Sequence, residues 1–438
     1  MAVVSIIGPK GGIGKTTLSI NTAAALTRAL KPATPDNRVC LVDLDLRLPT
    51  ISSLLESHPQ KTFYDVFETI ANKTYQVDFL RTLYRIVTLF KAHLNGDGRA
   101  SSPQLSKSFA LYQNLNPELF HFSEFRFGDQ MHELFLHRGE VVTPADLTLL
   151  KPLLDRLDLK AFREILQESE ENSRPAIDEY INYVEEYSFS ILGGEVPILG
   201  KKNHRKRINE PAFLVFFLEV LHELFDRFDY VILDTPAGGV NHLSSLMNSI
   251  DQVLFVFDMS NSIAVNGSID ALHSFIDYYE EFYDDFKAGR LTGLDKAYVN
   301  RLIASQGQEA VDETLRNKKL GIIFNRCQDT KSISQCLDRL REYLDTLDQY
   351  DAYKKRIHMV GMVPHHKIIN ITNNRGALFY DKDRGLSSRI NSVAQNVTTR
   401  FGECPTLDRS NREIINYLQK SSGFTFSKKI SRIASNFS

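Results

Sequence analysis

Short apolar runs recur along this chain and give the first indication of its fold. They are rich in β-branched residues, and they lie at residues 2–7, 39–42, 230–233, 252–257, 320–324 and 357–363. Apolar runs of this kind are typical of strands buried on both faces of a parallel sheet. After the first run, apolar residues recur near helical spacing at Leu18, Ala23, Leu26 and Leu30. The pattern therefore predicts a three-layer α/β fold with about seven or eight mostly parallel strands.

A long segment between the second and third runs lacks the strand pattern and reads as helical. Between residues 75 and 94, one helical stripe carries Phe79, Leu83, Ile86, Val87 and Phe90. Thr143 and Pro144 mark the start of a further helix. Aromatic side chains are frequent between residues 109 and 136, and they fit either a core or a partner surface. We favour the core and predict a mostly helical insertion over residues 71–187.

The insertion splits the α/β domain into residues 1–70 and 188–400. Residues 401–438 are then expected to form C-terminal helices. The last segment, 424–438, places apolar residues on one narrow helical stripe, at Phe426, Ile430, Ile433 and Phe437. Basic residues lie on its other face, and a basic amphipathic helix can bind an anionic membrane. Alternatively, this tail docks on its own domain or frays.

The stretch GPKGGIGKTT, residues 8–17, follows the first strand and opens the first helix. Strand, glycine loop and helix form the context in which a phosphate-binding loop occurs. The glycines that let backbone N–H groups turn toward phosphate oxygens are Gly11, Gly12 and Gly14. Lys15 would reach the β- and γ-phosphates, and the Thr16 hydroxyl would bind Mg²⁺. The sequence departs from the general pattern at Pro9, where a first glycine is expected.

Acidic residues follow two of the predicted strands. Asp43 and Asp45 come where the second run ends, and Asp234 closes the run at 230–233. Ligands of open α/β sheets bind at the carboxyl edge, where these side chains should meet. Carboxylates beside a triphosphate hold Mg²⁺ or orient an attacking water. Gly238 and Gly239 then predict a mobile loop that senses the γ-phosphate.

Asn325 ends the run at 320–324, at the same expected edge. Its side-chain amide pairs a donor and an acceptor with a base edge. GTPases offer N-K-x-D at this place, whereas NRCQ lacks the acid that reads guanine. Adenine is therefore the favoured base.

The stretches KGGIGKTT, VDLDLRLPT, VILDTPAGG, FNR and GMVP occur in this order. Together they resemble the MinD/ParA family of ATPases, whose phosphate loop is a deviant Walker A loop with one extra lysine. The resemblance covers roughly residues 1–70 and 188–400. It implies a P-loop NTPase fold that binds ATP with Mg²⁺ and forms a homodimer when ATP is bound. Lys10 is the extra lysine, and by resemblance it crosses the dimer interface to the partner's nucleotide.

The resemblance also implies roles for individual residues. Lys10, Lys15 and Asp45 would be catalytic, with Asp45 positioning the hydrolytic water. The nucleotide-binding residues would be Gly11, Gly12, Ile13, Gly14, Lys15, Thr16, Thr17, Asn325, Arg326 and Pro364. Within that set, Thr17 would meet the α-phosphate, while Asn325 and the loop at Pro364 would hold adenine. The metal site would consist of Thr16, Asp43 and Asp234.

Composition narrows the choice of partners and compartment. The 438-residue chain has a formal net charge of −2, so any affinity for DNA or an anionic membrane must be local. Its basic run at 201–207 fits a phosphate or lipid contact, but a solvated loop is the favoured interpretation. The four cysteines form no C-x-x-C pair, and no run reaches the roughly 18–20 apolar residues of a membrane span. The expected location is cytoplasmic, with peripheral attachment to the inner face of the cell membrane as an option.

The resemblance implies a switch that hydrolyses ATP to ADP and phosphate in order to position or partition a cellular cargo. Such switches work with an activating protein partner. Two other functions stay open. A nucleoid-binding DNA partition ATPase is disfavoured by the near-neutral charge, and an ATP-dependent carrier or targeting ATPase needs paired cysteines or a Met-rich groove. The chain has four scattered cysteines and six methionines.

Overall fold

The computed structural model describes most of the chain. The described residues are 2–30, 38–45, 50–55, 63–96, 101–116, 120–172, 177–193, 220–221, 223–224, 227–236, 250, 252–292, 295–296, 299–300, 302–303, 307–345, 348–373, 375 and 377–420. Predictions for the basic run 201–207, for Gly238 and Gly239, and for the tail 424–438 lie outside these residues. Within the described part, no helix combines the length and apolar character needed to cross a membrane.

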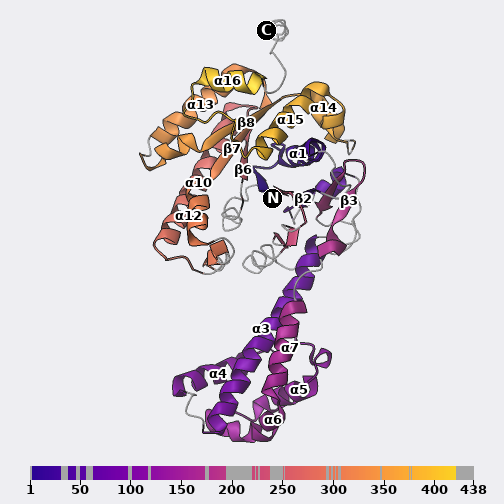
Figure 1. Cartoon of the computed structure of the whole chain (residues 1–438), viewed down its shortest axis with the longest axis vertical. Coiled ribbons are helices and arrows are strands. Elements are labelled where there is room, and N and C mark those ends of the chain that lie inside the picture. The colour runs from indigo at the N-terminus through magenta and orange to yellow at the C-terminus, as the bar shows by residue number, and fades with distance from the viewer. Residues whose placement is uncertain are drawn as a thin grey trace. The chain divides into compact units, whose positions relative to one another are not determined.

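Eight strands form one sheet in the order β3-β4-β2-β5-β1-β6-β7-β8 (Figure 1). Their bounds are β1 Ala2–Ile7, β2 Val39–Asp43, β3 Asn182–Val184, β4 Phe189–Leu192, β5 Tyr230–Asp234, β6 Gln252–Asp258, β7 Lys319–Cys327 and β8 Ile357–Pro364. All neighbouring strands are parallel except β3 and β4. The predicted mostly parallel α/β fold is confirmed, and each apolar run forms a strand.

The side chains of each strand alternate between the two faces of the sheet, and helices pack on both faces. Leu254 and Val256 of β6 belong to one buried cluster with residues of α1 (Lys15–Ala29) and α15 (Arg384–Thr398). The intervening Phe255 meets Phe275 of α10 (Ser262–Lys287), with ring centroids 5.3 Å apart. The sheet is therefore the middle of three layers. The other helices of this part are α2 Ile51–Leu54, α12 Gln308–Arg316, α13 Thr330–Asp345, α14 Lys367–Asn373 and α16 Asn411–Lys420, with 3-10 turns η5 Ile177–Tyr180, η6 Asp348–Lys355 and η7 Phe379–Asp381.

The strand register brings several carboxyl ends to one edge of the sheet. Asp43 is the register partner of Asp234, and Ile6 at the end of β1 also pairs with Asp234. On the other side of β1, Asp258 pairs with Asn325. Side chains from widely separated parts of the sequence therefore meet where parallel sheets bind ligands.

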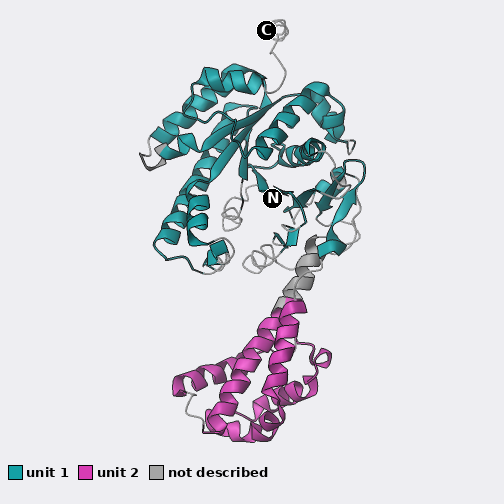
Figure 2. Ribbon diagram, in the orientation of Figure 1, with its two compact units in different colours: residues 1–66, 177–438 teal, residues 67–176 magenta. Residues whose placement is uncertain are grey.

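Residues 67–176 form a separate compact unit that is helical (Figure 2). Its helices are α3 Phe63–Leu94, α4 Ser102–Asn114, α5 Gly128–Leu136, α6 Lys151–Arg156 and α7 Leu159–Asn172, with 3-10 turns η2 Phe122–Glu124, η3 His137–Gly139 and η4 Pro144–Leu150. The predicted stripe on α3 is buried throughout, at Phe79, Leu83, Ile86, Val87 and Phe90. Phe120 stacks on Phe79 and Phe125, with centroids 4.3 and 4.8 Å apart. The aromatic residues of this segment thus build a core.

The boundary of this unit differs from the sequence prediction. The first unit comprises residues 1–66 and 177–438, whereas the insertion was expected to extend to residue 187. Ile177 and Tyr180 are buried, and β3 pairs in antiparallel fashion with β4. This stretch therefore extends the sheet. A strand of three residues leaves too short a pattern to be recognised in the sequence.

Candidate functional site

The turn between β1 and α1 is held in a conformation that glycine adopts readily. Gly12 and Gly14 have φ values of 75° and 95°, in the left-handed region. Gly14 is also the N-cap of α1, so the turn leads directly into the helix N-terminus. Gly11 is exposed on this turn, while Ile13 is buried beneath it. A glycine turn at a helix N-terminus is a site where backbone N–H groups and the helix dipole favour an anion.

Lys15 is the first residue of α1 and folds back over the turn. Its side chain is buried, and Nζ donates a hydrogen bond to the carbonyl oxygen of Lys10 over 3.1 Å. Burial lowers the pKa of Lys15, while the carboxylates of Asp234 and Asp45 act in the opposite direction. The ammonium group is thus enclosed by one backbone oxygen and two nearby acids, in the place where a phosphate loop uses its lysine.

Asp234 closes β5 and contacts α1 through both carboxylate oxygens. Thr16 Oγ1 donates to its Oδ2 over 2.6 Å, and Ser19 Oγ donates to its Oδ1 over 2.9 Å. Burial raises the pKa of Asp234, although both hydroxyl hydrogen bonds lower it. Ser19 lies one turn after Thr16 on α1, and its contact with Asp234 was not anticipated from the sequence.

Asp43 closes β2 and has a structural task besides its expected place near the metal. Its Oδ2 accepts hydrogen bonds from the backbone N–H groups of Thr50 and Ile51, over 3.0 and 3.1 Å. Its Oδ1 accepts from the backbone N–H of Asp45 over 3.0 Å. Asp43 therefore fixes both Asp45 and the start of α2. Burial and the nearby Asp234 raise the pKa of Asp43.

Several side-chain oxygen atoms lie close together at the start of α1. Thr16 Oγ1 is within hydrogen-bonding distance of Asp234 and lies 3.4 Å from Thr50 Oγ1. Magnesium prefers oxygen ligands, and it commonly takes one or two from the protein and the rest from phosphates and water. Among the described residues, no group of three or more His, Cys, Asp or Glu could hold a metal by itself. The donors present therefore fit Mg²⁺ held together with a nucleotide.

The second lysine of the turn has a different environment. The Lys10 side chain is 51% exposed, and its Nζ lies 3.7 Å from Oδ2 of the buried Asp258. Arg326 NH1 lies 3.4 Å from the same oxygen, and Arg326 also donates to the carbonyl oxygen of Gly12. Arg326 has a φ of 58°, which is strained for a residue with a side chain. Asp258 was not predicted as a site residue, although it is an acid at the end of an apolar run, as Asp43 and Asp234 are.

Asn325, expected to contact adenine, lies against the phosphate turn. Its Nδ2 donates to the carbonyl oxygen of Ile13 over 2.6 Å, and its side chain is buried. This approach needs a glycine next to Ile13, because a Cβ on Gly14 would lie 2.6 Å from the same Nδ2. Pro364 ends β8 opposite Cys327, at the same sheet edge. Thr17, expected at the α-phosphate, follows Thr16 on α1 and contacts Asn373.

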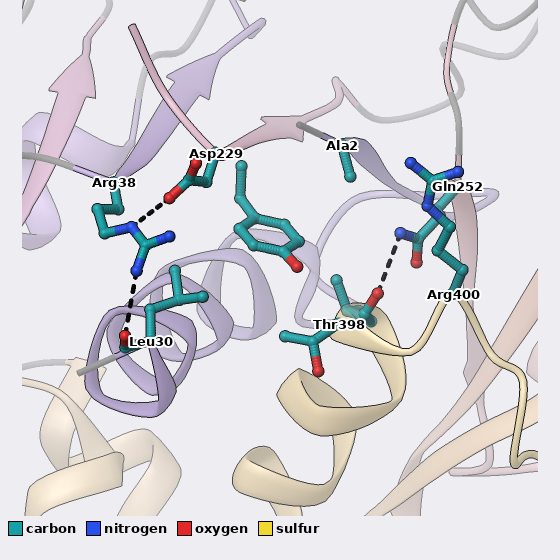
Figure 3. Close-up of a pocket in the computed structure, with 9 residues that line it drawn as sticks. Ala2, Leu30, Arg38, Asp229, Gln252, Thr398 and Arg400 are labelled. Carbon is teal, nitrogen blue, oxygen red and sulfur yellow. Dashed lines mark hydrogen bonds and ion pairs between the residues drawn. The ribbon is translucent and has the colours of Figure 1, made fainter. Parts of the chain in front are cut away.

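A separate polar cavity of about 190 Å³ lies at the amino-terminal edge of the sheet. Figure 3 shows Arg38 beside Asp229 and Leu30, with Gln252 and Arg400 across the cavity. Arg38 forms an ion pair with Asp229 and donates to the Leu30 carbonyl oxygen over 3.1 Å. The cavity is smaller than the roughly 300–1,000 Å³ of typical ligand pockets, and none of the predicted site residues lines it. The phosphate turn at the opposite edge is therefore the candidate site.

The fold and the turn together define a P-loop nucleotide-binding domain of the α/β class. The family model described as the CobQ/CobB/MinD/ParA nucleotide-binding domain matches residues 4–379. The chain therefore belongs to this family, which confirms the resemblance and places it among the P-loop ATPases of the MinD/ParA type.

Individual proteins match this chain over a short stretch or at low sequence identity. The antiactivator FleN of Pseudomonas aeruginosa is 42% identical over 66 residues, which cover 15% of this chain and 21% of FleN. The match thus spans about a fifth of FleN. The cell division ATPase MinD of Pyrococcus furiosus aligns with 13% identity and a TM-score of 0.44, over 91% of this chain and 99% of that one. A ParA family ATPase from Chlorobium tepidum aligns with 12% identity and a TM-score of 0.43, over 90% and 98%.

Proposed function

We propose that this chain is an ATP-dependent switch that dimerises with ATP bound and positions or partitions a cellular cargo. The different environments of the two loop lysines support this proposal best. Lys15 is buried in its own turn, whereas Lys10 is half exposed beside the carboxylate of Asp258. A loop cation that its own site leaves exposed is available to the nucleotide of a second subunit. The dimer would then form only when that nucleotide is present.

In this proposal each group of the site has one task. Lys15 and the turn bind the β- and γ-phosphates, and Thr16 and Asp234 bind the magnesium ion, which neutralises phosphate charge when bound. Asp43 holds Asp45 in place, and Asp45 orients the water that attacks the γ-phosphate. The partner's Lys10 stabilises the charge that builds up in the transition state. Hydrolysis to ADP and phosphate removes the group that Lys10 contacts and releases the dimer.

Light scattering after size exclusion tests the dimer directly. With ATP and Mg²⁺, Asp45→Ala should be a stable dimer, because it binds ATP but cannot activate water. Adding Lys10→Ala to that variant should return it to a monomer without loss of ATP binding. Lys355→Ala is the matched control, since Lys355 is an exposed lysine just before β8, at the opposite sheet edge. A monomeric Asp45→Ala protein at saturating ATP contradicts the proposal.

The surface that the dimer binds is proposed to be an anionic membrane, contacted through residues 424–438. This part of the proposal rests on the basic amphipathic pattern of that tail. Two tails in a dimer bind far more strongly than one, through effective concentration. Co-sedimentation with anionic liposomes should require both ATP and the tail. ATP-dependent, salt-sensitive DNA binding without liposome binding would instead support the DNA partition alternative.

A further inference from the structure

Asn373 at the end of α14 contacts the phosphate-binding helix and has no role in the proposal so far. Its Nδ2 donates a hydrogen bond of 3.0 Å to Thr17 Oγ1, across 356 positions of sequence. Thr17 is 9% exposed, so its hydroxyl is largely shielded from water. The tertiary fold therefore brings this amide to the residue that follows the magnesium-binding threonine.

Further hydrogen bonds hold this contact in place. The backbone N–H of Tyr380 donates to Asn21 Oδ1 over 3.0 Å, and Asn21 Nδ2 donates to the Thr17 carbonyl oxygen over 2.7 Å. Thr17 and Asn21 lie four residues apart, on one face of α1. Asn373 at the end of α14 and Tyr380 in η7 thus both contact that face of α1.

We propose that Asn373 is a positioning residue that aims the Thr17 hydroxyl at the α-phosphate of the bound nucleotide. A hydroxyl group has one proton and two acceptor lone pairs. The amide N–H of Asn373 occupies one lone pair, so the Thr17 proton is left for a phosphate oxygen. The inference rests on the proposed nucleotide site. Since ADP and ATP share the α-phosphate, it predicts equal effects on both nucleotides.

Calorimetric titration of ADP and ATP, with Mg²⁺ present, tests this role. Asn373→Ala should weaken both nucleotides by roughly three- to tenfold, the value of one hydrogen bond. Asn373→Asp should be worse, by more than about tenfold, because the carboxylate accepts the Thr17 proton and repels the phosphate. Asn370→Ala is the control and should bind like the wild type. Asn370 is an exposed asparagine on the same helix, without a side-chain hydrogen bond to described residues.

The aspartate variant separates positioning from mere anchoring. An anchoring contact survives in Asn373→Asp, since Thr17 can donate to the carboxylate, so nucleotide affinity would match the wild type once salt screens the added charge. That result, or unchanged affinity in Asn373→Ala, overturns the inference. Circular dichroism establishes that each variant is folded. A wild-type protein that binds neither nucleotide contradicts the proposed function itself, whereas binding without dimerisation contradicts the switch and leaves the role of Asn373 testable.

Discussion

Asp43 and Asp234 lie side by side as register partners on the adjacent parallel strands β2 and β5. Both carboxyl groups are buried, and burial is the main reason why the pKa of each is raised. The proximity of Asp234 raises the pKa of Asp43 further. Two acids held together in this way favour a proton or a cation between the strand ends. A change in the protonation of the pair therefore changes the negative charge at this edge of the sheet.

Replacing Asp234 with Asn should stabilise the nucleotide-free protein at pH 8 and abolish ATP hydrolysis. In the unfolded chain an aspartate loses its proton near pH ~4, whereas burial raises its pKa in the folded state. The folded state thus binds protons more tightly, so its stability falls as pH rises from about 4 to about 6, where Asp234 loses its proton in the folded state. The Asp234→Asn substitution removes this penalty but offers only one acceptor oxygen to the hydroxyls of Thr16 and Ser19, so the net gain is on the order of 1–2 kcal/mol. Chemical denaturation at pH 5 and pH 8 measures it.

The control for this prediction is Asp258→Asn. Asp258 is also buried at the same edge, but its carboxylate has two cationic neighbours, Lys10 and Arg326. Removing its charge loses both ion pairs, so the variant should be no more stable than the wild type at either pH. Equal stabilisation by both substitutions would mean that the raised pKa of Asp234 is not the cause.

Gly14→Ala should abolish nucleotide binding, while Gly12→Ala should only weaken it. Both glycines have left-handed φ values, and an alanine there costs on the order of 1–2 kcal/mol. At Gly14 the new Cβ would also lie 2.6 Å from Asn325 Nδ2, whereas at Gly12 it would meet nothing within 4 Å. The difference between the variants therefore isolates the clash with Asn325. Fluorescent-ADP titration of both proteins, each shown to be folded, measures it. Equal affinities would argue against a tightly packed turn.

The parts of the site that the sequence predicted all carry local patterns. The strand at residues 2–7 and the glycines of the turn follow one another directly, and the acids Asp43 and Asp234 end apolar runs. Neighbouring residues alone reveal such features, because buried parallel strands are continuous apolar segments. The acid Asp258 follows the same rule and was recognisable in principle.

Other features depend on contacts that no local pattern encodes. That Asn325 holds adenine stays a prediction, but its hydrogen bond from Nδ2 to the Ile13 carbonyl oxygen was not expected. The absence of a side chain at Gly14 makes that approach possible. Asn373 reaches Thr17 only through the fold of α14 against α1, and nothing near it in the sequence marks it. Tertiary contacts of this kind decide where a polar side chain finds its partner.

Leu83→Ala should destabilise the helical unit without changing the nucleotide site. Leu83 is fully buried among the residues of α3 and its neighbours, and a Leu→Ala cavity costs about 2–5 kcal/mol. Since residues 67–176 form their own compact unit with their own core, we expect calorimetry to show a separate transition that moves to lower temperature. The affinity for ADP should stay within about twofold of the wild type, because no predicted site residue belongs to this core. Leu272→Ala is the counterpart in the first unit, since Leu272 is fully buried on α10. It should lower the other transition, and a single transition displaced equally by both variants would show that the two units fold as one.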